Sequence, residues 1–128
     1  MILYPTVAEV IGLHARLIAQ FGGSFGIRDH SALESALARP HSGYYSDIIQ
    51  EAAALWESLS QNHPFLDGNK RVAVTTVAAF LTVNGYRLVF DDAEAFSFLM
   101  GIYESGNLCF KELEAWLRRH TVLAEPSR

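Results

Sequence analysis

Apolar side chains recur at intervals of three and four residues along most of the chain, which is the spacing of one face of an α-helix. The clearest stripe runs from Val7 to Phe21, includes His14, and ends at a Gly-Gly pair that is typical of a helix end. Similar stripes predict helices over about 31–38, 48–61 and 69–84, and two more that begin at about residues 92 and 108.

Polar residues that can cap helices stand in front of these stripes. Thr6 with Glu9, and Ser31 with Glu34, have the spacing of a capping box, in which two side chains bond the free backbone N–H groups of the first turn. Asp47 and Asn107 have the right chemistry to cap two further helices. They are expected to open the helices at about residues 48 and 108.

The stretch 69–84 is apolar on nearly every side and is expected to be the central, buried helix. Residues 86–90, YRLVF, suggest a short extended segment, and residues 121–128 are expected to be a frayed tail. The predicted fold is all-α: one compact bundle of about six helices around a buried central helix, forming a single domain over residues 1–128.

Composition narrows the possible functions. The net charge of −4 argues mildly against a general nucleic-acid binder, so no direct nucleic-acid partner is expected. Cys109 is the only cysteine, which excludes an intrachain disulfide and a multi-cysteine zinc site, and it is expected to be a small buried side chain. The apolar run 72–83 is too short to span a bilayer and no targeting segment is evident, so we expect a soluble cytoplasmic protein without a membrane partner.

The segment HPFLDGNKR, residues 63–71, stands out for its chemistry. Pro64 disfavours helical backbone in the residue before it, so the preceding helix should end by about Asn62, and Asp-Gly at 67–68 is a turn signal. The next helix begins there with N–H groups that lack intrahelical partners. Lys70 and Arg71 in its first turn oppose the helix dipole, at a cost of about 0.3–1 kcal/mol each if they are exposed. A bound anion such as phosphate would resolve that conflict.

Three further side chains of this segment suit a phosphate site. Asp67 is a hard oxygen ligand for Mg²⁺, Asn69 offers an amide donor to a phosphate oxygen, and His63 could accept a proton from an incoming hydroxyl. The set indicates phosphoryl or nucleotidyl transfer. Each residue also has a structural interpretation: Asp67 as a helix cap, Gly68 as a turn residue, and the two cations as solvated surface charges.

The same nine residues resemble the signature of the Fic/Doc superfamily, whose Fic branch reads H-P-F-x-[DE]-G-N-G-R-x-x-R. Lys70 replaces the last glycine, and Val74 stands where the second arginine would be. Both departures are typical of the Doc (death-on-curing) branch, with its H-x-F-x-D-x-N-K-R pattern. The segments GGSFGIRD, LESAL and NGYRL are also similar to that branch.

This resemblance implies the toxin of a toxin–antitoxin pair. Such a toxin acts as a kinase that transfers the γ-phosphate of ATP, with Mg²⁺, to a threonine of elongation factor Tu and arrests translation. His63 would be the base and Asp67 the metal ligand. Gly68, Asn69, Lys70 and Arg71 would form the phosphate-binding start of the helix.

Two alternatives stay open at this point. Pro64 and Gly68 are Fic-like, so transfer of AMP to a protein hydroxyl is the runner-up, and a catalytically silent domain that binds nucleotide or an antitoxin is the third. The inhibitory pattern [ST]-x-x-x-E-[GN] of Fic proteins finds no match, because Thr121 to Glu125 is followed by proline. Restraint by a partner, a Phd-like antitoxin, is therefore expected, through an amphipathic helix in an apolar groove near the site.

Several residues outside the motif also have a predicted place in the structure. His14, on the apolar stripe, is expected to be a hydrogen-bonded core histidine. The connector 40–46, with its Gly-Tyr-Tyr, could hold the target beside His63 or be a plain surface turn. Residues 24–29 are expected to form a second wall of the cleft.

Overall fold

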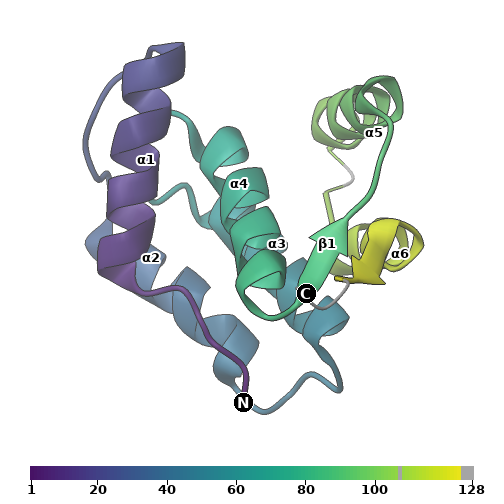
Figure 1. Ribbon diagram of the computed structural model, residues 1–128. Helices are drawn as coiled ribbons and strands as arrows, with labels where there is room; N and C mark the ends of the chain where they lie inside the picture. Colours follow the sequence, from purple (N-terminus) through teal and green to yellow (C-terminus); the bar gives the residue numbers. More distant parts are fainter. Residues whose placement is uncertain (107, 125–128) are drawn as a thin grey trace.

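The computed structural model describes residues 1–106 and 108–124 and is mostly helical (Figure 1). This confirms the all-α fold class with about six helices. In chain order the elements are α1 (Val7–Phe21), α2 (His30–Ala38), the 3₁₀ turn η1 (Arg39–His41), α3 (Ile48–Asn62), α4 (Asn69–Val83), β1 (Tyr86–Leu88), α5 (Asp92–Glu104), α6 (Phe110–His120) and β2 (Thr121–Leu123).

Local capping chemistry sets the starts of α1 and α3, as predicted. The hydroxyl of Thr6 accepts from the N–H of Glu9 at 3.1 Å, and the Glu9 carboxylate accepts from the N–H of Thr6 at 3.0 Å. At α3 the carboxylate of Asp47 accepts from the N–H of Gln50 at 3.0 Å. Both caps satisfy N–H groups that the helix itself leaves free.

The predicted caps of α2 and α6 need correction. The cap of α2 is Asp29, whose carboxylate accepts from the N–H of Ala32 at 3.0 Å, and not Ser31, which lies inside the helix. Before α6 stands Cys109, which makes no capping bond through its side chain, and the expected cap Asn107 lies outside the described residues. Cys109 is exposed, so the expectation of a buried thiol is wrong.

The central position in the bundle belongs to α3 rather than to residues 69–84, because α3 packs against more of the other helices and has more buried residues than α4. α3 packs against α2, α4 and α6, and its small side chains at 52–54 allow these neighbours to approach closely. α4 buries the face turned toward α3 but leaves Val83 and the two cations of its first turn exposed. Among the described residues, no helix is both long and apolar enough to cross a bilayer. The buried apolar residues of α3 are Ile48, Ala52, Ala53, Ala54, Leu55, Trp56 and Leu59.

The two short strands join the end of the described chain to the turn after α4. β1 and β2 pair antiparallel, with Tyr86 opposite Leu123 and Leu88 opposite Thr121. The N–H of Ala124 extends the ladder by donating to the carbonyl of Gly85 at 2.9 Å. The extended segment at 86–88 is thus confirmed. The prediction of a frayed tail is wrong for residues 121–124, because their backbone groups bond to β1 and to Gly85. Residues 125–128 lie outside the described residues.

Candidate active site

The loop between α3 and α4 begins with a histidine in an uncommon backbone conformation. α3 ends at Asn62, as Pro64 predicts, and His63 takes left-handed dihedral angles, φ 47° and ψ 57°. Arg28 holds this turn: its Nε donates to the carbonyl of His63 at 2.6 Å and its Nη2 to that of Asn62 at 2.8 Å. The guanidinium thereby satisfies the carbonyls of the last residue of α3 and of its cap His63, and His63 is exposed to solvent.

Residues 24–29 lie beside the motif, but none of them lines the depression at His63 described below, so the expected second wall of the cleft is not found. The N–H of Arg28 donates to the carbonyl of Pro64 at 2.8 Å, and the N–H of Leu66 donates to the carbonyl of Gly26 at 3.1 Å. These bonds make a short antiparallel bridge between two loops that are far apart in the sequence. The bridge holds the first half of the motif against the loop that precedes α2.

The side chain of Asn69 closes the motif loop on itself. Its Oδ1 accepts from the N–H of Phe65 at 3.0 Å, and its Nδ2 donates to the carbonyl of Phe65 at 2.9 Å. Phe65 is buried, so these backbone groups have little access to water. The amide predicted to contact phosphate is therefore bonded to the backbone of the loop through both its oxygen and its nitrogen.

Asp67 presents an exposed carboxylate whose two oxygens are both oriented by backbone donors. Oδ1 accepts from the N–H of Gly68 at 2.8 Å, and Oδ2 accepts from the N–H of Ser24 at 3.2 Å. A Cβ atom on Gly23 would lie 2.6 Å from Oδ2, so only glycine lets the α1–α2 loop approach this closely. The carboxylate keeps lone pairs that a cation could use.

α4 begins without a capping side chain. Its cap residue Gly68 has φ 75°, and the first intrahelical bond runs from the N–H of Val72 to the carbonyl of Gly68 at 3.0 Å. The N–H groups of residues 69–71 precede that bond, whereas the starts of α1, α2, α3 and α5 are each bonded by a Thr or Asp side chain. This helix end combines free donors with the positive end of the dipole.

The two cations of the first turn lie over aromatic rings on opposite sides of α4. Lys70 Nζ is 5.0 Å from the centroid of the Tyr103 ring on α5, and Arg71 Cζ is 4.2 Å from that of Phe21 at the end of α1. Such contacts stabilise exposed cations by about 0.5–1 kcal/mol. None of the ion pairs found among the described residues involves either side chain.

One depression of about 400 Å³ brings all the predicted site residues together. It is lined by Leu66 and by His63, Asp67, Gly68, Asn69, Lys70 and Arg71. A groove of about 460 Å³ adjoins it between α4 and α5, and the two share Lys70 and Arg71. The arrangement combines a base, a carboxylate and a cationic helix start within one concave surface, which is what phosphoryl or nucleotidyl transfer needs.

The sequence did not reveal two residues that hold this site. Arg28 has no sequence pattern that marks it, because its partners are backbone carbonyls 34 and 35 positions away. His14 is confirmed as a hydrogen-bonded core histidine: it is 3% exposed and its Nε2 lies 2.7 Å from the carbonyl oxygen of Asp67. The position of His14 on an apolar stripe predicted its burial but not its partner.

The connector 40–46 lies at the opposite end of α2 from the motif loop (Figure 1). Tyr44 is exposed, and Tyr45 stacks on Phe110 and accepts a hydrogen bond from Arg39 Nε at 2.7 Å. The residues that line the depression at His63 all come from the motif. This placement favours the surface-turn interpretation of the connector.

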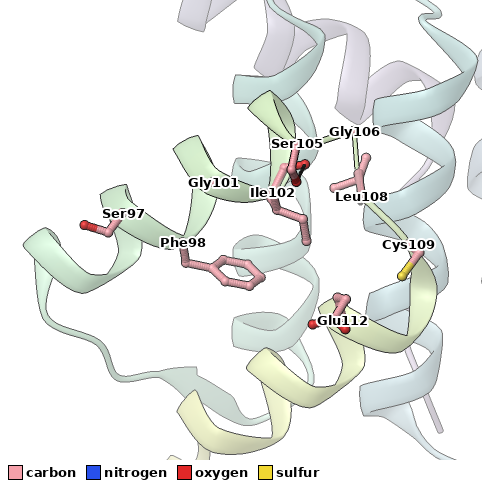
Figure 2. Close-up of a pocket in the computed structure, with 9 residues that line it drawn as sticks. All are labelled: Ser97, Phe98, Gly101, Ile102, Ser105, Gly106, Leu108, Cys109 and Glu112. Atoms are coloured by element: carbon pink, nitrogen blue, oxygen red, sulfur yellow. Dashed lines mark hydrogen bonds between the residues drawn. The ribbon is translucent and has the colours of Figure 1, made fainter.

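A separate depression of about 640 Å³ lies between α5 and α6 (Figure 2). Figure 2 shows Phe98 of α5 and Glu112 of α6 approaching it from opposite helices, with Cys109 at its rim. Glu112 is the only charged residue among its described lining residues. A surface with one anionic and no cationic side chain does not suit phosphate, so the motif depression is the better candidate site.

Comparison with known proteins identifies the family of this chain. Residues 4–81, more than half of the chain, match the Fic/DOC family. The chain is similar to "Toxin Doc" of Mycolicibacterium smegmatis, with 41% identity over 76 residues that cover 56% of this chain and 58% of that protein. It is also similar to "Protein kinase doc" of Escherichia phage P1, with 29% identity over 115 residues that cover 87% of this chain and 90% of that protein.

Proposed function

The chain belongs to the Fic/DOC family, and we propose that it is the toxin of a toxin–antitoxin pair, a kinase that transfers the γ-phosphate of ATP to a hydroxyl group of a target protein. The observation that carries the proposal is the shared depression: His63, Asp67 and the uncapped start of α4 all line it. The names of the two relatives, a toxin and a protein kinase, support the same reading.

The residues present fit Mg-ATP by their chemistry. Among the described residues, no cluster of three or more His, Cys, Asp or Glu side chains could hold a metal alone. Mg²⁺ commonly takes one or two carboxylates and completes its shell with phosphate oxygens and water, and Asp67 can supply one carboxylate. The free N–H groups of residues 69–71 suit the phosphates, and bound Mg-ATP would supply the phosphoryl group and the metal charge that neutralises it.

His63 is proposed as the base. It lines the depression and is exposed to solvent, so a protein hydroxyl can reach it. Arg28 holds its backbone through a hydrogen bond to its carbonyl. Accepting the hydroxyl proton prepares that oxygen for attack, which typically contributes about 10²–10⁴-fold in rate.

The choice of γ-phosphate over AMP rests on two positions in α4. Lys70 extends from the first turn toward Tyr103, and this places its charge on the α5 side of the helix start. Val74, one turn later, lines the adjoining groove with an uncharged side chain, so there is no second arginine at that position to clamp a distal phosphate. Both features support a nucleotide position different from that in AMP transferases.

We propose elongation factor Tu, through a threonine, as the target, and a Phd-like antitoxin as the restraining partner. The groove between α4 and α5 suits an amphipathic helix, because Phe96 and Met100 expose apolar side chains along it. Lys70 and Arg71 at its end would attract acidic residues of that helix. An antitoxin bound there would cover both cations of the site.

Phosphate labelling tests the proposal. The protein is incubated with elongation factor Tu and Mg-ATP labelled at either the α or the γ phosphate, beside a His63→Ala variant and a His30→Ala control. Transfer of γ label that falls at least a hundredfold in His63→Ala alone would support the kinase. Transfer of α label would establish AMP transfer instead, and absence of both labels would favour the silent module.

A further inference from the structure

His14 is buried and makes two independent contacts with the motif. It is buried on α1, and its ring stacks on the ring of Phe65 with centroids 3.8 Å apart and planes 7° from parallel. Its Nε2 lies 2.7 Å from the carbonyl oxygen of Asp67. Because a carbonyl can only accept, Nε2 must carry the proton. The stack sets the plane of the ring, and the hydrogen bond sets which edge faces the loop.

The hydrogen bond from His14 to the carbonyl of Asp67 orients the whole peptide unit between Asp67 and Gly68. The peptide unit that joins Asp67 to Gly68 is planar and trans, so its C=O and N–H point in opposite directions. With the carbonyl turned inward to His14, the N–H of Gly68 turns outward, where it donates to Asp67 Oδ1 at 2.8 Å. The orientation of one peptide plane therefore decides on which side the carboxylate is held.

The surrounding packing matches this arrangement. A Cβ atom on Gly68 would lie 3.3 Å from Ile18 Cδ1 and 3.6 Å from His14 Nε2, so the turn rests closely on α1. On the outer side, the N–H of Ser24 donates to Asp67 Oδ2 at 3.2 Å. α1 and the loop after it thus hold the Asp67 residue from both sides.

We propose that His14 is a positioning residue for the metal-binding carboxylate: it fixes the Asp67–Gly68 peptide so that the carboxylate faces the depression at the start of α4. The proposal rests on the proposed function, since it assigns His14 to the orientation of the expected Mg²⁺ ligand. His14 touches neither the phosphates nor the target in this role and acts only through the backbone of Asp67.

Two variants separate the hydrogen bond from the packing. His14→Phe keeps an aromatic ring on Phe65 but has no donor, whereas His14→Gln keeps an N–H donor without the stack. We expect His14→Phe to raise the Mg²⁺ concentration for half-maximal label transfer by about tenfold, as for partners that orient a metal ligand, with the KM for the protein target unchanged. His14→Gln should recover part of that loss. An unchanged Mg²⁺ titration in an active, folded His14→Phe protein would overturn the proposal.

A second readout needs neither nucleotide nor activity. Amide hydrogen exchange at Gly68, followed by NMR, should be about tenfold faster in His14→Phe, because the N–H loses its fixed direction toward Asp67. Unchanged exchange at Gly68 would overturn the proposal for His14, whether or not the wild-type protein transfers label. Absence of label transfer by the wild-type protein would count against the kinase activity alone. Should His14→Phe fail to fold, the wild-type protein decides: its His14 must carry the proton on Nε2 in ¹H–¹⁵N spectra, and a ring protonated on Nδ1 only would refute the bond.

Discussion

Replacing Asn69 with alanine separates two roles for this side chain. The sequence predicts an amide donor for phosphate, whereas the structure has the amide bonded to both backbone groups of Phe65. If the loop clamp is its main role, Asn69→Ala should destabilise the fold even without nucleotide. If phosphate binding is its main role, stability should be unchanged and only nucleotide affinity should fall.

The expected cost follows from the two bonds that are lost. Each is worth about 1 kcal/mol net, and the buried N–H and C=O of Phe65 left without partners add to the penalty. Alanine returns about 0.5 kcal/mol through its higher helix propensity. We therefore expect the free energy of unfolding to fall by roughly 2–3 kcal/mol in Asn69→Ala, which for a domain of this size lowers Tm by about 10 °C.

Thermal and urea unfolding without nucleotide measure this loss. Asn62→Ala is the matched control, because the Asn62 side chain makes one hydrogen bond within the described part of the chain, to the carbonyl of Ala32 at 3.2 Å. Its loss should be about 1 kcal/mol, well below that of Asn69→Ala. Equal Tm values for wild-type protein and Asn69→Ala would refute the clamp and return Asn69 to the phosphate contact predicted from the sequence.

Two further predictions concern the pH dependence of stability and the steric effect of a side chain at Gly23. Burial, together with the hydrogen bond and charge of Glu51, raises the pKa of Tyr4 from 10.0 to about 12. Between about pH 10 and 12 the folded state thus keeps a proton that the unfolded state loses, so the free energy of unfolding should fall as the pH rises. The fall should be less steep in Tyr4→Phe. Equal pH slopes of the free energy of unfolding in the two proteins, measured with urea, would contradict this. In Gly23→Ala the new Cβ would lie 2.6 Å from Asp67 Oδ2, so the Mg²⁺ requirement for label transfer should rise about tenfold. Gly22→Ala, whose Cβ meets open space at a similarly positive φ, should leave that requirement nearly unchanged, and identical titrations of the two variants would refute the steric account.

The helix caps whose hydrogen-bond partners lie within a few residues in the sequence could be predicted from the sequence. The capping box of Thr6 and the cap at Asp47 depend on groups three positions away, and both are confirmed. The prediction that Ser31 caps α2 was wrong because Asp29, two residues earlier, also has capping chemistry. The backbone N–H of Asp29 donates to the carbonyl of Pro64 at 3.1 Å. That tertiary bond fixes where the helix begins, and it involves a residue 35 positions later in the chain.

Features that depend on distant partners were not predictable. The strand at 121–123 forms because β1 offers it backbone partners, which a three-residue pattern cannot reveal. The apolar run of α4 suggested a central helix, but the small side chains of α3 allow closer packing around that helix instead. The residues that the motif's chemistry predicts for the site line one depression, and their role stays a prediction. The supports from His14 and Arg28 became visible only in the folded chain.

Calorimetric titration of the protein with Mg-ATP tests most directly whether the uncapped start of α4 binds a triphosphate. We predict a measurable heat of binding for the wild-type protein, with the affinity weakened about tenfold in Lys70→Met, which removes the charge and keeps a long side chain. No heat of binding from wild-type protein that is folded by circular dichroism would contradict the account.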